Sequence, residues 1–139
     1  MHLLALDLGL TTGYAVLEED GSIVTHGTMP WQELDIVLVD LLREYTPRWV
    51  VAEPPVIIRG PLGEKLTYVV SSVRQIVHDV EEIDPAQWKN SWWRDVPTPR
   101  PKNKKGISQH QKDALRMGWW YLEVKLKRSN IRANVLRNV

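Results

Sequence analysis

The first part of the chain alternates short apolar runs with turn-forming residues, a pattern typical of β-strands. Residues 3–6 are apolar, and Gly9 and Gly13 follow, which allow a tight reversal of the chain. Two further apolar runs lie at residues 14–17 and 23–28, with an acidic, glycine-containing turn between them. These runs predict an antiparallel meander of three strands.

Apolar positions then take the three-to-four-residue spacing of amphipathic helices. Pro85 suits a first helical turn, and Ser108 can act as an N-cap. Two more short strands are expected at residues 49–52 and 80–83. The predicted helices span about residues 34–46, 62–78, 85–92 and 108–126.

A meander joined to helix-connected strands predicts an α/β fold, with a five-stranded mixed sheet flanked by helices. This is the order of an RNase H-like domain, although the order alone does not single it out. We expect residues 1–128 to form one such domain, since a chain of 139 residues fits a single domain. Residues 97–107, rich in proline and lysine, should form a mobile basic loop, and residues 129–139 a basic C-terminal tail.

The composition limits the chemistry. The chain has no cysteine, which excludes disulfides and thiolate zinc sites and leaves oxygen and imidazole ligands, suited to Mg²⁺ or Mn²⁺. No signal peptide and no apolar run of ~20 residues is present, so we expect a cytoplasmic protein with no membrane partner.

Charge is divided unevenly along the chain. Residues 1–84 contain 5 Lys/Arg and 14 Asp/Glu, whereas residues 85–139 contain 13 Lys/Arg and 3 Asp/Glu. A basic C-terminal part favours a polyanionic partner such as nucleic acid, although a solubilising tail would give the same counts. An acidic half could face nucleic acid only if cations bound its carboxylates.

Four side chains are candidates for catalysis and metal binding. Asp7 ends the first strand and Glu53 the fourth, and these strands are neighbours in an RNase H-like sheet. His110 and Asp113 are three residues apart and therefore share a helix face. Clustered carboxylates raise their own pKa values, and two Mg²⁺ ions, with Mn²⁺ as a substitute, would relieve the repulsion and clamp a phosphodiester.

Each candidate also has an ordinary structural interpretation. Asp7 could be a turn former, and Glu53 a solvated strand end. Asp113 could pair with Lys112 or Arg116 on its own helix. If all of these structural interpretations held, the acidic residues at the three positions would have to arise from three separate coincidences. Taken together, the three positions therefore favour a functional site.

Basic residues predict how nucleic acid is held. Lys102, Lys104 and Lys105 lie on the expected loop just before the last helix, where they could contact phosphates. The same patch could be extended by Lys89, Arg94 and Arg100. A disordered basic linker is the alternative interpretation. The chain has 7 Trp and no Phe. The pairs at 92–93 and 119–120 should each place at least one ring in the core, with Trp93 the better candidate for exposure.

Several motifs together resemble RuvC-type Holliday-junction resolvases. Residues 4–16 (LALDLGLTTGYAV) resemble the opening motif of that family, and residues 50–53 (VVAE) its second acidic motif. Residues 110–115 (HQKDAL) are similar to the final helix motif, and residues 85–89 (PAQWK) to a proline-led helix that carries a lysine. The resemblance covers most of residues 3–122.

The resemblance implies a homodimeric, Mg²⁺-dependent endonuclease that nicks two opposed strands of a four-way DNA junction. Asp7 would bridge two metal ions, with Glu53 and Asp113 as further ligands. His110 would bind a metal ion or help to activate the attacking water. The helix at about 62–78 would supply the dimer contact.

The chain also departs from the family. It is shorter between Trp93 and Ser108, which is typical of compact, phage-encoded relatives that act in the host cytoplasm. The family places an aromatic residue after the second acidic motif, where this chain has prolines and then Ile57, Ile58 and Arg59. These three residues are therefore candidates for contact with the junction centre, with Arg59 as a nucleic-acid ligand.

Other functions remain open. An RNase H-like nuclease that acts on RNA and a non-catalytic junction-binding protein would both fit the motifs. The string at residues 7–13 also resembles the first phosphate motif of the actin and sugar-kinase superfamily. Those proteins need two such domains around a nucleotide, more than 139 residues can supply.

Overall fold

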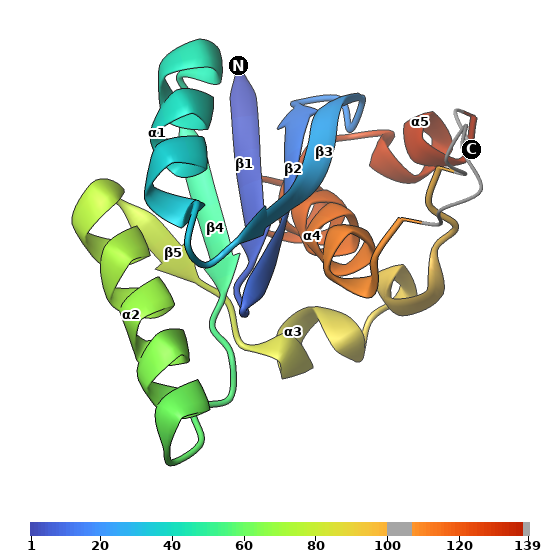
Figure 1. Cartoon of the computed structure of the whole chain (residues 1–139). Helices are drawn as coiled ribbons and strands as arrows, with labels where there is room; N and C mark the ends of the chain where they lie inside the picture. Colours follow the sequence, from blue (N-terminus) through green and yellow to red (C-terminus); the bar gives the residue numbers. More distant parts are fainter. Residues whose placement is uncertain (100–106, 138–139) are drawn as a thin grey trace.

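One mixed sheet of five strands forms the centre of the molecule (Figure 1). The computed structural model describes residues 1–99 and 107–137. The strand order is β3-β2-β1-β4-β5, with β1 antiparallel to β2 and parallel to β4. The strands are β1 (His2–Asp7), β2 (Thr11–Glu18), β3 (Ile23–Pro30), β4 (Trp49–Glu53) and β5 (Val80–Glu82). The predicted α/β fold with its meander is confirmed.

Helices cover both faces of this sheet. In Figure 1, α1 and α2 lie on one side, and α4 and α5 on the other, with α3 below the end of β1 and β4. The helices are α1 (Leu34–Tyr45), α2 (Pro61–Ile76), α3 (Pro85–Lys89), α4 (Gln109–Trp120) and α5 (Ile131–Arg137). No helix in the described part of the chain is long and apolar enough to cross a membrane.

The alternation of side chains along β1 divides the core into two clusters. Leu3 and Ala5 pack on the α4 side, whereas Leu4 and Leu6 pack on the side of α1 and α2. All four are at most 1% exposed, so β1 is a central strand buried on both faces. A buried central strand gives its terminal residue, Asp7, a fixed position.

The helix that was expected to run from Pro85 to Trp92 is interrupted. It ends at Lys89, and a separate 3₁₀ turn, Trp92–Asp95, follows. Ser91 causes the break, because its hydroxyl donates to the Trp88 carbonyl (2.5 Å) and accepts from the Trp93 amide (3.2 Å). The expectation that Trp93 is exposed is wrong: Trp93 is 0% exposed, and its neighbour Trp92 is 45% exposed.

The last predicted helix begins as expected. The Ser108 hydroxyl accepts a hydrogen bond from the Gln111 amide (3.2 Å) and caps α4. After Trp120 the chain continues as a wider π turn, Tyr121–Lys125, and then as α5. Within the expected basic tail, residues 131–137 thus form a helix that buries Ile131 and Val135.

Candidate functional site

Asp7 and Glu53 lie side by side where β1 and β4 end. The parallel pairing of the strands places the two residues directly opposite each other. Both are only 6% exposed, although both belong to residue types that are seldom buried without a partner. The predicted juxtaposition of these two carboxylates at one edge of the sheet is therefore observed, and it explains why neither behaves as a solvated strand end.

Burial and the neighbouring carboxyl groups change the protonation of Asp7. Burial, a hydrogen bond to Glu53 and the charges of Glu53 and Asp113 together raise the pKa of Asp7 from 3.8 to about 9, whereas Lys89 lowers it. A hydrogen bond between two carboxyl groups requires one of them to keep a proton. The raised pKa of Asp7 therefore favours its neutral form until a further positive charge enters the site.

His110 completes the edge from the opposite side. Its Nδ1 lies 2.7 Å from Oδ2 of Asp7, within hydrogen-bond distance, and its side chain is 46% exposed. The backbone of α4 reaches this position because Gly13 has no side chain: a Cβ there would lie 2.2 Å from the His110 carbonyl carbon and oxygen. Gly13 is thus part of β2, where it permits the close approach of α4, and does not serve the reversal of the chain.

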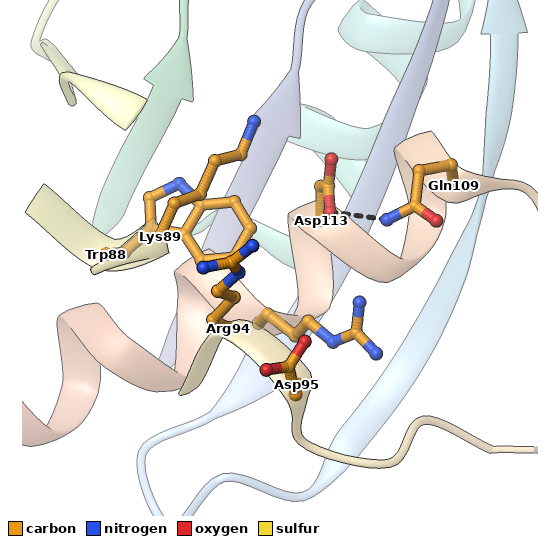
Figure 2. Close-up of a pocket in the computed structure, with 7 residues that line it drawn as sticks. Trp88, Lys89, Arg94, Asp95, Gln109 and Asp113 are labelled. Atoms are coloured by element: carbon orange, nitrogen blue, oxygen red, sulfur yellow. Dashed lines mark hydrogen bonds between the residues drawn. The ribbon is translucent and has the colours of Figure 1, made fainter. Parts of the chain in front are cut away.

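Asp113 lies one helical turn further along α4. Its Oδ1 accepts a hydrogen bond from Nε2 of Gln109 (2.8 Å), as Figure 2 shows. The negative charge of Asp113 contributes to the raised pKa of Asp7, which places the two carboxylates within electrostatic reach. The alternative pairing of Asp113 with Lys112 or Arg116 is not found among the described residues.

The four side chains differ in how ready they are to bind a cation. Asp7, Glu53, Asp113 and His110 offer hard oxygen donors and one imidazole, the ligand set that Mg²⁺ and Mn²⁺ accept. Within residues 1–99 and 107–137, however, no group of three or more such side chains is arranged to hold an ion. The donor types and the raised pKa of Asp7 fit a divalent cation, and Asp113 is turned toward Gln109 instead of toward the other carboxylates.

Helix α3 holds Glu53 through two neighbouring residues. The indole Nε1–H of Trp88 donates to Oε1 of Glu53 (2.8 Å), and Nζ of Lys89 lies 3.6 Å from Oε2. Asp84 caps the helix and Pro85 begins it, so this short turn has a defined position against β4. Trp88 was not among the site residues predicted from the sequence. The one feature that could have indicated it is its position next to Lys89 in the proline-led helix.

The predicted nucleic-acid ligands are dispersed. Lys89 is half-buried beside Glu53, and Arg59 is exposed on the loop between β4 and α2. Lys102, Lys104 and Lys105 lie outside the described residues. Of the two candidates that the structure describes, Lys89 is the one that lies beside the paired carboxylates.

Comparison with known proteins extends this picture. No protein-family model and no curated protein matches the chain. Among solved structures, Thermus thermophilus RuvC in complex with Holliday junction substrate matches with a TM-score of 0.70 and 15% sequence identity, over 91% of this chain and 96% of that chain. A second structure of Thermus thermophilus RuvC gives 0.69 and 15%, over 92% and 98% of the two chains.

The mixed five-stranded sheet with helices on both faces is an RNase H-like fold. Within that class, the match over more than nine-tenths of both chains defines a RuvC-like fold. The resemblance inferred from the short motifs is thus confirmed at the level of the fold.

Proposed function

We propose that this protein is a divalent-metal-dependent endonuclease that cleaves four-way DNA junctions. The observation that carries the proposal is the buried pair of carboxylates, Asp7 and Glu53, with His110 of α4 within hydrogen-bond distance of Asp7 and Asp113 one turn further along that helix. The likeness to RuvC, which has been solved with a Holliday junction substrate, supports a junction as the substrate of this chain as well. A match along nearly the whole chain favours this function over a nucleotide-binding half-domain.

Asp7, Glu53, Asp113 and His110 would hold two Mg²⁺ ions, or Mn²⁺ in their place. When bound, such ions supply positive charge that activates a water molecule and stabilises the leaving oxygen of the phosphodiester. The arrangement of the two carboxylates favours cation binding. A second negative charge on the Asp7–Glu53 pair is unfavourable without a cation, as the raised pKa of Asp7 indicates. Ion binding and loss of the Asp7 proton are therefore coupled.

His110 is oriented for a role toward water. Because Nδ1 is engaged by Asp7, Nε2 is the ring nitrogen left to bind an ion or to accept a proton, and no partner of Nε2 occurs among the described residues. Hydrogen bonding by one nitrogen also fixes the plane of the ring. The half-exposed side chain can reach a substrate that approaches this edge.

A junction requires two coordinated cuts, which a homodimer provides. Helix α2 is the proposed contact, since it exposes Leu62 (39%) and follows a loop that exposes Ile57 (52%) and Ile58 (48%). Exposed apolar side chains gathered on one helix and its preceding loop are typical of an interface. Arg59 on that loop and Lys89, Lys102, Lys104 and Lys105 are the proposed phosphate contacts.

The experiment that tests the function uses labelled four-way junction, splayed duplex and linear duplex with Mg²⁺, Mn²⁺ or EDTA. The Asp7→Asn variant tests the site, and Asp40→Asn, an exposed acid on α1, is the matched control. Paired nicks near the crossover that need metal and Asp7 are the expected result. Cleavage of every branched substrate alike would leave a general nuclease and overturn junction selectivity.

RNA and simple binding are the competing outcomes. The same set of variants is incubated with structured RNA, and binding of each substrate is measured in EDTA. Cleavage of RNA alone would replace DNA as the substrate. Tight junction binding without any cleavage would contradict an enzymatic role and leave a junction-binding protein.

A further inference from the structure

A cavity of about 320 Å³ opens between α3, the 3₁₀ turn Trp92–Asp95 and α4. Asp113, one of the four proposed ligands, forms part of its wall (Figure 2). The cavity therefore lies next to the proposed metal-binding residues. Its volume is comparable to that of small-ligand sites. Its lining residues are Trp88, Lys89, Arg94, Asp95, Gln109, Asp113 and Arg116.

Three cations line this cavity, one from each of the three elements. Lys89 is engaged with Glu53 at the catalytic edge. Arg94 and Arg116 have no carboxylate within 4.0 Å among residues 1–99 and 107–137. Two arginines without acidic partners beside one hollow leave positive charge available to an anion from solution.

Arg116 is held in place from behind. Its Nε donates to the carbonyl of Val96 (3.0 Å), which anchors the guanidinium at the wall of the cavity that Arg116 lines. A guanidinium with a fixed plane binds phosphate oxygens through parallel hydrogen bonds, at less entropic cost than a free side chain. Arg116 is therefore better suited to a phosphate than a surface arginine of the same charge.

We propose that this cavity binds a backbone phosphate of the DNA, next to the phosphate that is cut, with Arg116 as its central ligand and Arg94 as the second. This inference rests on the proposed function and deepens it. It extends the contact surface from the carboxylate edge along α4, through Lys89, to a second anchoring point. The strand would then be held at the scissile phosphate and at one neighbouring phosphate, which positions it without reading its bases.

Two acidic side chains, Asp95 and Asp113, also line the cavity. Asp113 belongs to the catalytic edge, whereas Asp95 lines the cavity beside the arginines without any role in the proposed cleavage chemistry. Its negative charge opposes a phosphate there. Neutralising Asp95 should therefore strengthen binding, while neutralising Arg94 or Arg116 should weaken it.

The test measures junction affinity across a range of salt concentrations, in the Asp7→Asn background so that the DNA stays intact. Arg116→Gln and Arg94→Gln should each weaken binding about 3- to 10-fold at moderate salt and lower the salt slope by about 1. Asp95→Asn should shift the affinity in the opposite direction. Arg116→Lys, which keeps the charge and loses the planar fork, should lie between wild type and Arg116→Gln.

Arg43→Gln, on the exposed last turn of α1, removes the same charge on the other side of the sheet and should leave affinity and slope unchanged. Thermal unfolding of each variant confirms that it is folded. Equal affinity of the Arg116 and Arg94 variants and the control would overturn the cavity as a phosphate site and leave the proposed function intact. A protein that binds DNA through both arginines and never cleaves it would overturn the function alone, and a wild type that binds no DNA would overturn both.

Discussion

The two faces of the sheet are packed with different kinds of side chain. On the side of α1 and α2, the fully buried residues are aliphatic or methionine, such as Leu34, Leu38 and Val69. On the side of α4, the core is rich in aromatic residues. Helix α4, which carries the candidate catalytic residues His110 and Asp113, lies on this side. The buried aromatic residues there are Trp88, Trp93, Trp119, Trp120 and Tyr121.

The two kinds of packing differ in whether they orient the groups that they contact. Aliphatic packing stabilises in proportion to area and has no preferred orientation. An indole adds an N–H that must find a partner when buried. Trp88 donates to Glu53 (2.8 Å), Trp93 to Glu123 (3.2 Å), and Trp119 to the carbonyl of Gly21 (2.9 Å). The aromatic side therefore fixes the positions of particular groups, whereas the aliphatic side mainly supplies stability.

The largest expected effect is the loss of activity in Asp7→Asn. The amide cannot carry the negative charge that a cation requires, so cleavage of the junction should fall about 10³-fold or more. The variant should remain folded, because Asn has nearly the shape of a protonated Asp. Single-turnover cleavage and thermal unfolding measure the two properties separately. Cleavage at more than a tenth of the wild-type rate would remove Asp7 from the mechanism.

The aliphatic side should respond in the opposite way. Leu38, on α1, is 0% exposed, and Leu38→Ala should lower the free energy of unfolding by about 3 kcal/mol through lost burial and a cavity. Cleavage per folded molecule should change little at a temperature where the variant is folded. Urea titration and active-site titration give the two values. A large loss of activity with little loss of stability would break the distinction between the two faces.

Trp88→Phe separates direction from packing on the aromatic side. Phenylalanine fills most of the space and removes the hydrogen bond to Glu53, so cleavage should fall about 10- to 100-fold, with a higher Mg²⁺ requirement. Trp119→Phe is the matched control, since it loses the same volume and an indole hydrogen bond, there to Gly21. Both variants should lose similar stability. Equal loss of activity in the two would mean that Trp88 acts only through the core.

The fold was predictable because its strongest signals are local. The apolar runs at β1 and β4 end at Asp7 and Glu53, and parallel pairing of these strands then brings the two acids together. The spacing of His110 and Asp113 on α4 was equally readable, because helical periodicity depends only on residues close in sequence. These features account for the layout of the sheet and for the four candidate ligands.

Contacts between distant segments were not predictable in the same way. Nothing near Trp88 in the sequence indicates that its indole donates to a residue on β4. Trp93 lies next to a basic, proline-rich segment and is nevertheless buried, because the turn begun by Ser91 directs it inward. Gly13 likewise has a role only once α4 lies against β2. Each of these depends on how two elements meet, which periodicity does not encode.

The smallest expected effect concerns stability against pH in the absence of divalent ions. The pKa of Asp7 is 3.8 when unperturbed and about 9 in the folded chain, so between these values the folded state binds a proton that the unfolded state has released. Stability from this group is therefore complete below about pH 4 and is lost progressively as the pH rises toward 9.

Asp7→Asn should remove this dependence and be more stable than wild type in EDTA at pH 8, because wild type must take up a proton from solution to fold at that pH, whereas the amide is neutral at every pH. Mg²⁺ should raise the unfolding temperature of wild type at pH 8 and leave that of the variant nearly unchanged. Thermal unfolding from pH 5 to pH 9, with EDTA or Mg²⁺, measures both effects. Parallel pH profiles for the two proteins would show that the pKa of Asp7 is not raised in the folded protein without a cation. That outcome would contradict the prediction and remove one of the observations that favour metal binding by this pair.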